Sequence, residues 1–490
     1  MKQFAKAVAA FSAGSAVGTF TQIAKGKLSA IALGADGVGV IAQLTNAWNF
    51  LVALSSLGLY NGVVRRVSEA KRAGDWVQVR TQLSTAIIAL SLTSVTVSAV
   101  AALASAPLSA WLFAGDESKS LFVALTLVSV PLGVIAQTYR AVLSGLQQVR
   151  AIVRVQVISD LVGLALFALL IWLDDLRGAV LAFSAMHLVK ALMQWRSIRK
   201  IDGFGPLLVN ASHFSAGEVR PHLAYGINGL VMTSIAVGST LLVSTWTIQS
   251  LGEAGNGIFS VAWKVASLYF GAIYASAGAY YFPVLASVEN NRELGQKVND
   301  AAKLYMFLLP PAIAALLTLG QELMIVLFSE EFVIASLVLV LLLPADIFRV
   351  LSESVGMAFL AKRRLWPYTT SYLVWAVTFA GLSYSLLPIY GVAGIGLAYL
   401  VSQLINFQVV SKIARNYFGF AMDPSCIRAM FAGLLLVTAC GVSVCLLDGL
   451  IARTTVFAVF MSCWFAIVWR DASFQGLVSA GLRRMHGFVR

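Results

Sequence analysis

One short glycine-rich stretch of the sequence, Leu33-Gly34-Ala35-Asp36-Gly37-Val38-Gly39, has a similar second copy. The second copy lies 218 residues later and reads Leu251-Gly252-Glu253-Ala254-Gly255-Asn256-Gly257. Apolar segments long enough to cross a membrane flank both copies. Glycines suit a tight turn that needs positive φ and close packing of two helix ends. The repeat therefore predicts two copies of one unit, in which this turn joins the first and second spans of a six-span set.

The composition is that of a chain built mostly of membrane spans. Of its 490 residues, 59% are hydrophobic and 12% are charged, and the mean hydropathy is +0.83. A soluble globular protein averages about 45–50% apolar and about 25% charged residues. These values exclude a soluble enzyme, a disordered chain and a nucleic-acid-binding protein, in spite of the net charge of +13.

Apolar spans can be placed along the whole chain, and we count fourteen. They lie near residues 8–33, 38–62, 82–105, 119–142, 152–173, 178–197, 223–250, 257–283, 302–328, 333–358, 366–388, 391–412, 427–447 and 453–469. Six crossings per set give both sets the same orientation. The sequence thus predicts an all-α polytopic membrane protein with two six-helix lobes, related by a pseudo-two-fold axis along the membrane normal. The predicted parts are an N-terminal lobe (1–203), a cytoplasmic linker (204–222), a C-terminal lobe (223–420), and two additional helices with a cytoplasmic tail (421–490).

The basic residues indicate the orientation. Most of the 35 lysines and arginines lie in alternate loops, and the opposite loops hold only Lys119, Arg177 and Arg453. The positive-inside rule then places both termini in the cytoplasm of a bacterial inner-membrane protein. The opposite loops are short and carry acidic pairs such as Asp116 and Glu117, which we interpret as solvated loop residues.

Catalytic, metal and cofactor chemistry have no support in the sequence. The external loops are too short to carry a catalytic domain, which disfavours a membrane polysaccharide polymerase or ligase, and we expect no catalytic residues. The cysteines and histidines show no metal-ligand spacing. We expect the cysteines to be small buried residues, and they are Cys426, Cys440, Cys445 and Cys463.

A small or polar helix face on the second span has a counterpart on the eighth span. It consists of Asn46, Asn49, Ala53, Ser56 and Tyr60, and the offset maps it onto Lys264, Ser267, Gly271, Tyr274 and Gly278. Such faces also serve as ordinary packing seams between membrane helices. For Asn46, Asn49 and Lys264 we favour a substrate cavity. Asn46, Asn49, Ser56, Tyr60, Ser267 and Tyr274 offer the amides, hydroxyls and aromatic rings that sugars need.

Charges inside the predicted spans are candidate functional groups, because a charge near the bilayer centre costs about 2.5–3.5 kcal/mol. They are Lys25, Lys27, Asp160, Lys264, Asp346, Arg349 and Glu353. Lys264 has no acidic residue three or four positions away, and a cation in a low-dielectric cavity stabilises a phosphate strongly. Lys264 is therefore the strongest candidate for a contact with an anionic substrate.

The other intramembrane charges leave alternatives open. Asp346, Arg349 and Glu353 lie on one helix face and form either an internal ion-pair ladder or an ion-coupling network. The residues four positions from Asp160 are Gln156 and Leu164, neither of which can neutralise it, which makes Asp160 a second candidate for ion coupling. We expect Arg140 and Lys190 to reach the cytoplasmic headgroups and to have little functional weight.

These segments together resemble a known family. The turn at 33–39, the run Leu57-Gly58-Leu59 and the basic stretch Val63–Arg72 are similar to the first two spans of Wzx-type polysaccharide flippases, members of the multidrug/oligosaccharidyl-lipid/polysaccharide exporter superfamily. The run Tyr281–Ala286, followed by Asn299 and Lys303, resembles the matching stretch of O-antigen translocases. The same holds for Asp346–Arg349 followed by Lys362-Arg363-Arg364. The resemblance covers roughly residues 8 to 415.

The resemblance implies a transporter that works by alternating access. Its cargo would be an undecaprenyl-pyrophosphate-linked oligosaccharide, moved to the periplasmic leaflet for O-antigen, exopolysaccharide or capsule synthesis, with membrane lipids and possible polymerase and chain-length proteins of the pathway as partners. Relatives often keep cations in spans 1, 2 and 8, and Lys25 or Lys27 and Lys264 occupy two of these spans. Span 2 offers Asn46 and Asn49 instead. The main alternative is a cation-coupled multidrug or metabolite exporter of the same superfamily.

Overall fold

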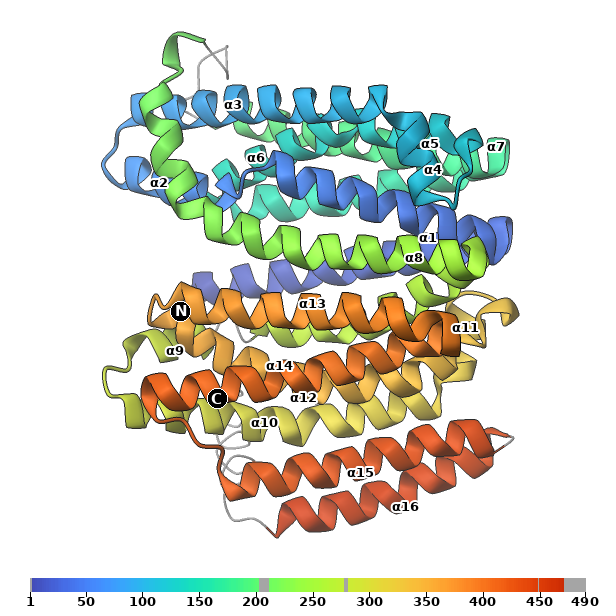
Figure 1. The fold of residues 1–490 in the computed structure, drawn as a ribbon. Helices are drawn as coiled ribbons and strands as arrows, with labels where there is room; N and C mark the ends of the chain where they lie inside the picture. Colours follow the sequence, from blue (N-terminus) through green and yellow to red (C-terminus); the bar gives the residue numbers. More distant parts are fainter. Residues whose placement is uncertain (1, 202–210, 277–280, 448, 471–490) are drawn as a thin grey trace. The chain divides into compact units, whose positions relative to one another are not determined.

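The computed structural model describes residues 2–201, 211–276, 281–447 and 449–470, with side chains except those of 2–12, 220–225, 228 and 271–276. Within these ranges the chain is helical and contains no β-strand. Two compact units divide it, residues 1–257 and 258–490 (Figure 1). The boundary falls inside one long helix, and the predicted linker between lobes at 204–222 stays a prediction.

The first unit contains the helices up to the end of the second glycine-rich turn at Gly257. They are α1 (Lys2–Ser55), α2 (Leu59–Arg72), α3 (Trp76–Leu103), α4 (Ser105–Leu112), the 3-10 helix η1 (Glu117–Lys119), α5 (Ser120–Val128), α6 (Val130–Gly145), α7 (Val149–Arg199), η2 (Ala211–His213) and the larger part of α8 (Ala216–Ser276). Side-chain capping fixes the beginning of α3. The Asp75 side chain accepts a hydrogen bond from the Gln78 backbone N–H at 2.8 Å and so caps the N-terminus of this helix.

The second unit begins with the last part of α8, from Ile258 onward. Its helices are α9 (Phe282–Ser287), α10 (Asn291–Thr318), α11 (Gly320–Leu327), the 3-10 helix η4 (Glu330–Phe332), α12 (Ala335–Ala361), α13 (Leu365–Tyr390), α14 (Val392–Phe418), α15 (Pro424–Leu446) and α16 (Leu450–Trp469). Helices α15 and α16 lie side by side, and α15 packs on α10 (Figure 1). Arg453 at the beginning of α16 is buried and pairs with Glu322 of α11 at 2.7 Å.

Eleven helices in the described part of the chain are long and apolar enough to cross a membrane. Three of them are 43, 51 and 42 residues long, about twice the length that one crossing needs. Each of the three contains a break, at Gly34 in α1, at Asp174 and Asp175 in α7, and at Gly252 in α8. Divided at these breaks, the eleven helices give the fourteen predicted spans.

The second span is shorter than predicted. The sequence places it at 38–62, whereas α1 ends at Ser55. Leu57 and Gly58 follow with φ of 48° and 65°, which a right-handed helix cannot contain. A separate amphipathic helix, α2, then begins at Leu59 and buries Val63 and Val67 against its neighbours. Ser56 and Tyr60 consequently do not continue the helix face of Asn46 and Asn49.

The expectation for the cysteines is only half correct. Cys426 and Cys440 are buried, whereas Cys445 and Cys463 are exposed on α15 and α16. An apolar residue on a lipid-facing helix needs no protein neighbour, because the bilayer itself is an apolar solvent. Hydropathy therefore could not separate the two pairs.

Candidate functional site

Gly34 and Gly252 adopt the same backbone conformation at positions that the repeat makes equivalent. Gly34 has φ 62° and ψ −166°, and Gly252 has φ 75° and ψ −177°. This region of φ/ψ space is essentially open to glycine alone. The sequence repeat is thereby confirmed in the backbone of both turns, where it breaks α1 and α8 in the same way.

The two turns contact each other through a reciprocal pair of glycines. A Cβ atom added to Gly39 would lie 1.9 Å from the carbonyl oxygen of Glu253, and one added to Gly257 would lie 2.1 Å from the carbonyl oxygen of Ala35. The offset relates Ala35 to Glu253 and Gly39 to Gly257, so each contact is the two-fold image of the other. Two backbones can approach this closely only where the side chain is absent.

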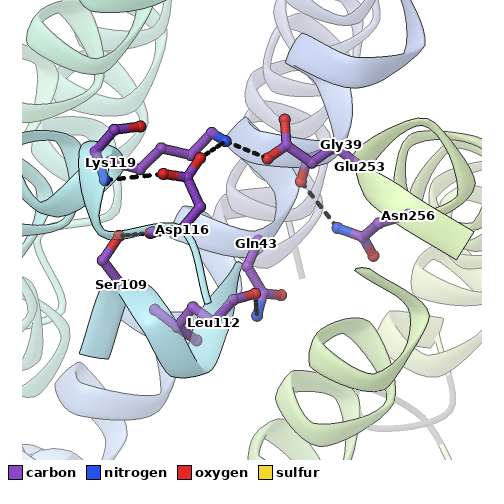
Figure 2. Close-up of polar contacts among 9 residues, drawn as sticks. Gly39, Gln43, Ser109, Leu112, Asp116, Lys119, Glu253 and Asn256 are labelled. Atoms are coloured by element: carbon purple, nitrogen blue, oxygen red, sulfur yellow. Dashed lines mark hydrogen bonds and ion pairs between the residues drawn. The ribbon is translucent and has the colours of Figure 1, made fainter. Parts of the chain in front are cut away.

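Buried amides hold the same junction together (Figure 2). The Asn256 Nδ2 donates to the carbonyl oxygen of Gly39 at 2.8 Å. The Asn256 Oδ1 accepts from the Ser244 hydroxyl at 2.7 Å. The Gln43 Nε2 donates to the Thr245 hydroxyl at 2.7 Å. Burial of a polar group costs free energy unless a hydrogen bond compensates it. These amides therefore fix how the second half of α1 lies against α8.

An ion cluster joins a third turn to the junction. The Lys119 Nζ lies 2.6 Å from Asp116 Oδ2 and also pairs with Glu253 (Figure 2). The hydrogen bond from Lys119 and the donors of Ser118 lower the pKa of Asp116 from 3.8 to about 2. Asp116 thus stays ionised at neutral pH, and the interpretation of it as a merely solvated residue is incomplete. We call residues 34–39, 116–119 and 252–257 the turn cluster.

Asp160 is paired, contrary to the expectation of an isolated carboxylate. Its Oδ1 lies 3.3 Å from the Lys190 Nζ, and its Oδ2 accepts from the Gln156 Nε2 at 2.5 Å. Lys190 lies on the second half of α7, which the break at Asp174 and Asp175 separates from the first half. Lys190 was expected to reach the headgroups, but the helix fold instead brings it to the carboxylate.

The other predicted residues of the first unit lie apart from one another. Lys25 is half-buried and its Nζ contacts the Met186 sulfur at 3.1 Å, and Lys27 is also half-buried. Asn46 is half-buried and Asn49 is exposed on the second half of α1. The remaining two lie beyond the end of α1, where Ser56 donates to the Ala53 carbonyl at 2.9 Å and the Tyr60 hydroxyl lies 3.2 Å from that of Ser144.

Lys264 and Ser267 are exposed on α8, on one helix face. Lys264 makes no hydrogen bond or ion pair with any residue that the structure describes. The side chain of Tyr274 lies outside the described residues, as does the whole of Gly278. Next to Lys264 on the helix, the Trp263 ring lies 5.1 Å from that of Tyr399.

The acidic and basic residues of α12 form a network with tyrosines. Asp346 lies 3.6 Å from Arg349 and accepts hydrogen bonds from the hydroxyls of Tyr269 and Tyr399, the latter at 3.0 Å. Glu353 accepts from the hydroxyls of two tyrosines on α13, Tyr368 at 3.1 Å and Tyr372 at 2.8 Å. The Arg349 guanidinium also lies over the ring of Phe270 at 3.5 Å. The pairing of Asp346 with Arg349 agrees with the predicted ladder.

Sequence reasoning missed the partners that come from other helices. Lys190, Glu253, Tyr269 and Tyr399 each lie far along the chain from the group that they bind. Hydropathy and helical spacing test only residues on one helix, so these pairs leave no signal in either. The tyrosines carried a weak signal, because a buried phenol hydroxyl usually finds a hydrogen-bond partner.

Comparisons with known proteins agree with these observations. The family described as "Polysaccharide biosynthesis protein" matches residues 28–289. The lipid III flippases of Escherichia coli (strain K12) and of Shigella flexneri are each 23% identical over 398 residues, which is 78% of this chain and 91% of theirs.

Among solved structures, an inward-facing multidrug resistance MATE family transporter matches with a TM-score of 0.70 at 17% identity, over 84% of this chain and 98% of that one. The lipid II flippase MurJ in an inward closed conformation matches with a TM-score of 0.68 at 15% identity, over 94% and 98%. These likenesses show a common two-lobed transporter fold. By the match over more than half of its length, the chain belongs to the polysaccharide biosynthesis protein family.

Proposed function

We propose that the chain translocates an undecaprenyl-pyrophosphate-linked oligosaccharide across the bacterial inner membrane, for the synthesis of O-antigen, exopolysaccharide or capsule. Membership of the polysaccharide biosynthesis family and the likeness to the lipid III flippases support this proposal. The fold shared with transporters favours alternating access over catalysis. Both termini would lie in the cytoplasm, and the polymerase and chain-length proteins of the pathway are candidate partners.

The observation that carries the proposal is the balance of charge inside the spans. Asp160 and Asp346 already have cationic partners, Lys190 and Arg349. Glu353 is instead stabilised by the hydroxyls of Tyr368 and Tyr372. Lys264, by contrast, has no acidic partner among the described residues. The positive charge of Lys264 fits a pyrophosphate and opposes a cationic drug. This favours a flippase over a cation-coupled multidrug or metabolite exporter.

The remaining candidate residues would serve the glycan and the energy coupling. Asn46 and Asn49 would bind sugar hydroxyls, with Ser267 as a further donor. We also include three further residues in the proposed sugar contacts, namely Ser56, Tyr60 and Tyr274. The structure describes the side chains of only the first two. Lys25 or Lys27 would add positive charge near the pyrophosphate. Asp160 and the network of Asp346, Arg349 and Glu353 would change protonation or pairing during transport.

The turn cluster would act as the external closure in this cycle. By the predicted orientation, all three of its turns lie on the periplasmic side. The backbone contacts of Gly39 and Gly257 bring the turns together, and Lys119 binds two of them through Asp116 and Glu253. Release of cargo to the periplasm would require these contacts to separate.

Deletion of the coding sequence tests the proposal in the cell. We expect lipid-linked repeat units to accumulate on the cytoplasmic side, with loss of the surface polymer and restoration by the wild-type chain. Normal polymer, or precursors that remain accessible from the periplasm, would contradict the proposal. A drug-efflux assay on the same strains separates the alternative, because an exporter of cationic compounds would leave the deletion strain more sensitive to them.

A further inference from the structure

A polar cavity of about 290 Å³ opens to the surface of the first unit, among α1, α6 and α7. Its polar lining consists of Ser15, Thr19, Gln22, Arg140 and Gln156. A cavity lined by hydroxyls, amides and a guanidinium in apolar helices marks a site for a polar group, because lipid tails cannot satisfy its donors. None of these residues was among the predicted site residues.

Two glycines bring α1 close to α7 along this cavity. A Cβ atom on Gly14 would lie 3.0 Å from the Val153 Cγ1, and one on Gly18 would lie 3.1 Å from the Asp160 Oδ2. The close approach places the polar face of α1 opposite Gln156 and Arg140. The cavity is therefore built by the packing of these helices.

Arg140 is the uncompensated charge of the cavity. Its Nη1 donates to the Gln156 Oε1 at 3.4 Å, and no carboxylate lies within ion-pair distance among the residues that the structure describes. The nearby Asp160 is already bound by Lys190 and Gln156. A guanidinium has five N–H donors, so most of the donors of Arg140 remain available to a ligand.

We propose that Arg140 contacts the diphosphate of a polyprenyl-linked substrate at a loading site in this cavity, an inference that rests on the proposed function. Arg140 lies five residues before the end of α6 at Gly145, a depth of about 8 Å at 1.5 Å per residue. By the predicted orientation that end is cytoplasmic, where a lipid-linked precursor carries its diphosphate at headgroup depth. A planar guanidinium binds phosphate oxygens in a bidentate manner, and the hydroxyls of Ser15 and Thr19 add neutral donors.

Direct binding tests the loading site. The full-length chain is placed in phosphatidylcholine nanodiscs, and the affinity for radiolabelled undecaprenyl pyrophosphate is compared between wild type and variants. Arg140→Gln should bind about tenfold or more weakly, because a hydrogen bond to a charged group is lost. Arg140→Lys should retain part of the affinity. Arg154→Gln is the matched control, since it removes one exposed arginine near the same predicted side and should bind like wild type.

A second variant keeps the test independent of the charge. Ser15→Leu fills the cavity and leaves Arg140 in place, so it should also weaken binding. Melting temperatures measured on the same samples identify any variant that loses its fold. If the folded Arg140→Gln and Ser15→Leu proteins both bind undecaprenyl pyrophosphate like wild type, the loading site is overturned.

A phospholipid headgroup offers the same phosphate chemistry, and a second arm distinguishes it. Phosphatidylglycerol replaces undecaprenyl pyrophosphate as the labelled probe. We expect its binding to be unchanged in Arg140→Gln, and an equal loss for both lipids would overturn the assignment to the substrate. Translocation by the wild-type chain is measured separately. Its failure removes the proposed function, whereas intact translocation with unchanged binding in Arg140→Gln removes only the loading site.

Discussion

Replacement of Gly257 by alanine should push the two glycine-rich turns apart. The added Cβ would lie 2.1 Å from the carbonyl oxygen of Ala35, whereas real Cβ contacts essentially never fall below 3.0 Å. The obstacle is backbone, so a turn must move by about 1 Å, and overpacking of this kind costs about 1–3 kcal/mol. The shift also threatens the hydrogen bond from Asn256 to Gly39. We expect a lower melting temperature for the purified full-length chain.

Gly229→Ala is the control for this experiment. Gly229 lies on the same helix, α8, and a Cβ atom there would have no neighbour within 4 Å. Alanine is the better helix former by about 1 kcal/mol, so this variant should melt at or above wild type. The same substitution on one helix should thus lower the melting temperature at Gly257 and leave it unchanged or raise it at Gly229. The reasoning is wrong if Gly257→Ala is as stable as Gly229→Ala, because the turns would then not meet at this contact.

Three further predictions address individual charges. Lys264→Ala should leave the melting temperature nearly unchanged, because no described residue pairs with the lysine. Polymer export should nevertheless fall steeply, and Lys264→Arg should keep part of it. Wild-type export by the alanine variant at matched protein levels would make the charge incidental. Asp160→Asn leaves Lys190 without its carboxylate and should cost on the order of 3 kcal/mol of stability. Full stability of this variant, with an unchanged pH or sodium dependence of transport, would show that Asp160 serves neither the ion pair nor the coupling. Asp116 has a lowered pKa of about 2, so its pairing with Lys119 contributes stability that is fully present above the ordinary value of 3.8 and is lost as the pH falls through about 2. The melting-temperature difference between wild type and Asp116→Asn should therefore be constant from pH 5 to pH 8, and a difference that changes with pH in this range would show that another group controls the cluster.

The turn conformation could be predicted from sequence because its cause is local. Gly34 and Gly252 adopt backbone angles that side chains exclude, so the same residue must return wherever the same turn is used. The close contact between Gly39 and Glu253 requires a glycine, and that glycine is visible in the sequence. Which backbone lies opposite it cannot be read from the sequence, because this depends on how α1 packs on α8. That packing joins residues more than 200 positions apart, and spacing rules do not reach so far.

The charge partners show the same limit. Helical spacing predicts an isolated Asp160, because its neighbours on the helix are Gln156 and Leu164. Its cation, Lys190, comes from beyond the break in α7. Helical spacing places Tyr60 on the face of Asn46, because the predicted span continues to residue 62. The backbone leaves the helix at Leu57, for which composition gave no warning beyond the glycine that follows it.

The central claim is tested by reconstituting the purified chain in liposomes with a fluorescent undecaprenyl-pyrophosphate-linked oligosaccharide and adding an impermeant quencher outside. In protein-free liposomes about half of the fluorescence should stay protected, since the lipid lies in both leaflets. With the wild-type chain, the protected fraction should fall toward zero as cargo from the inner leaflet reaches the quencher, and Lys264→Ala should slow this fall. An equal protected fraction with and without the chain would contradict the account.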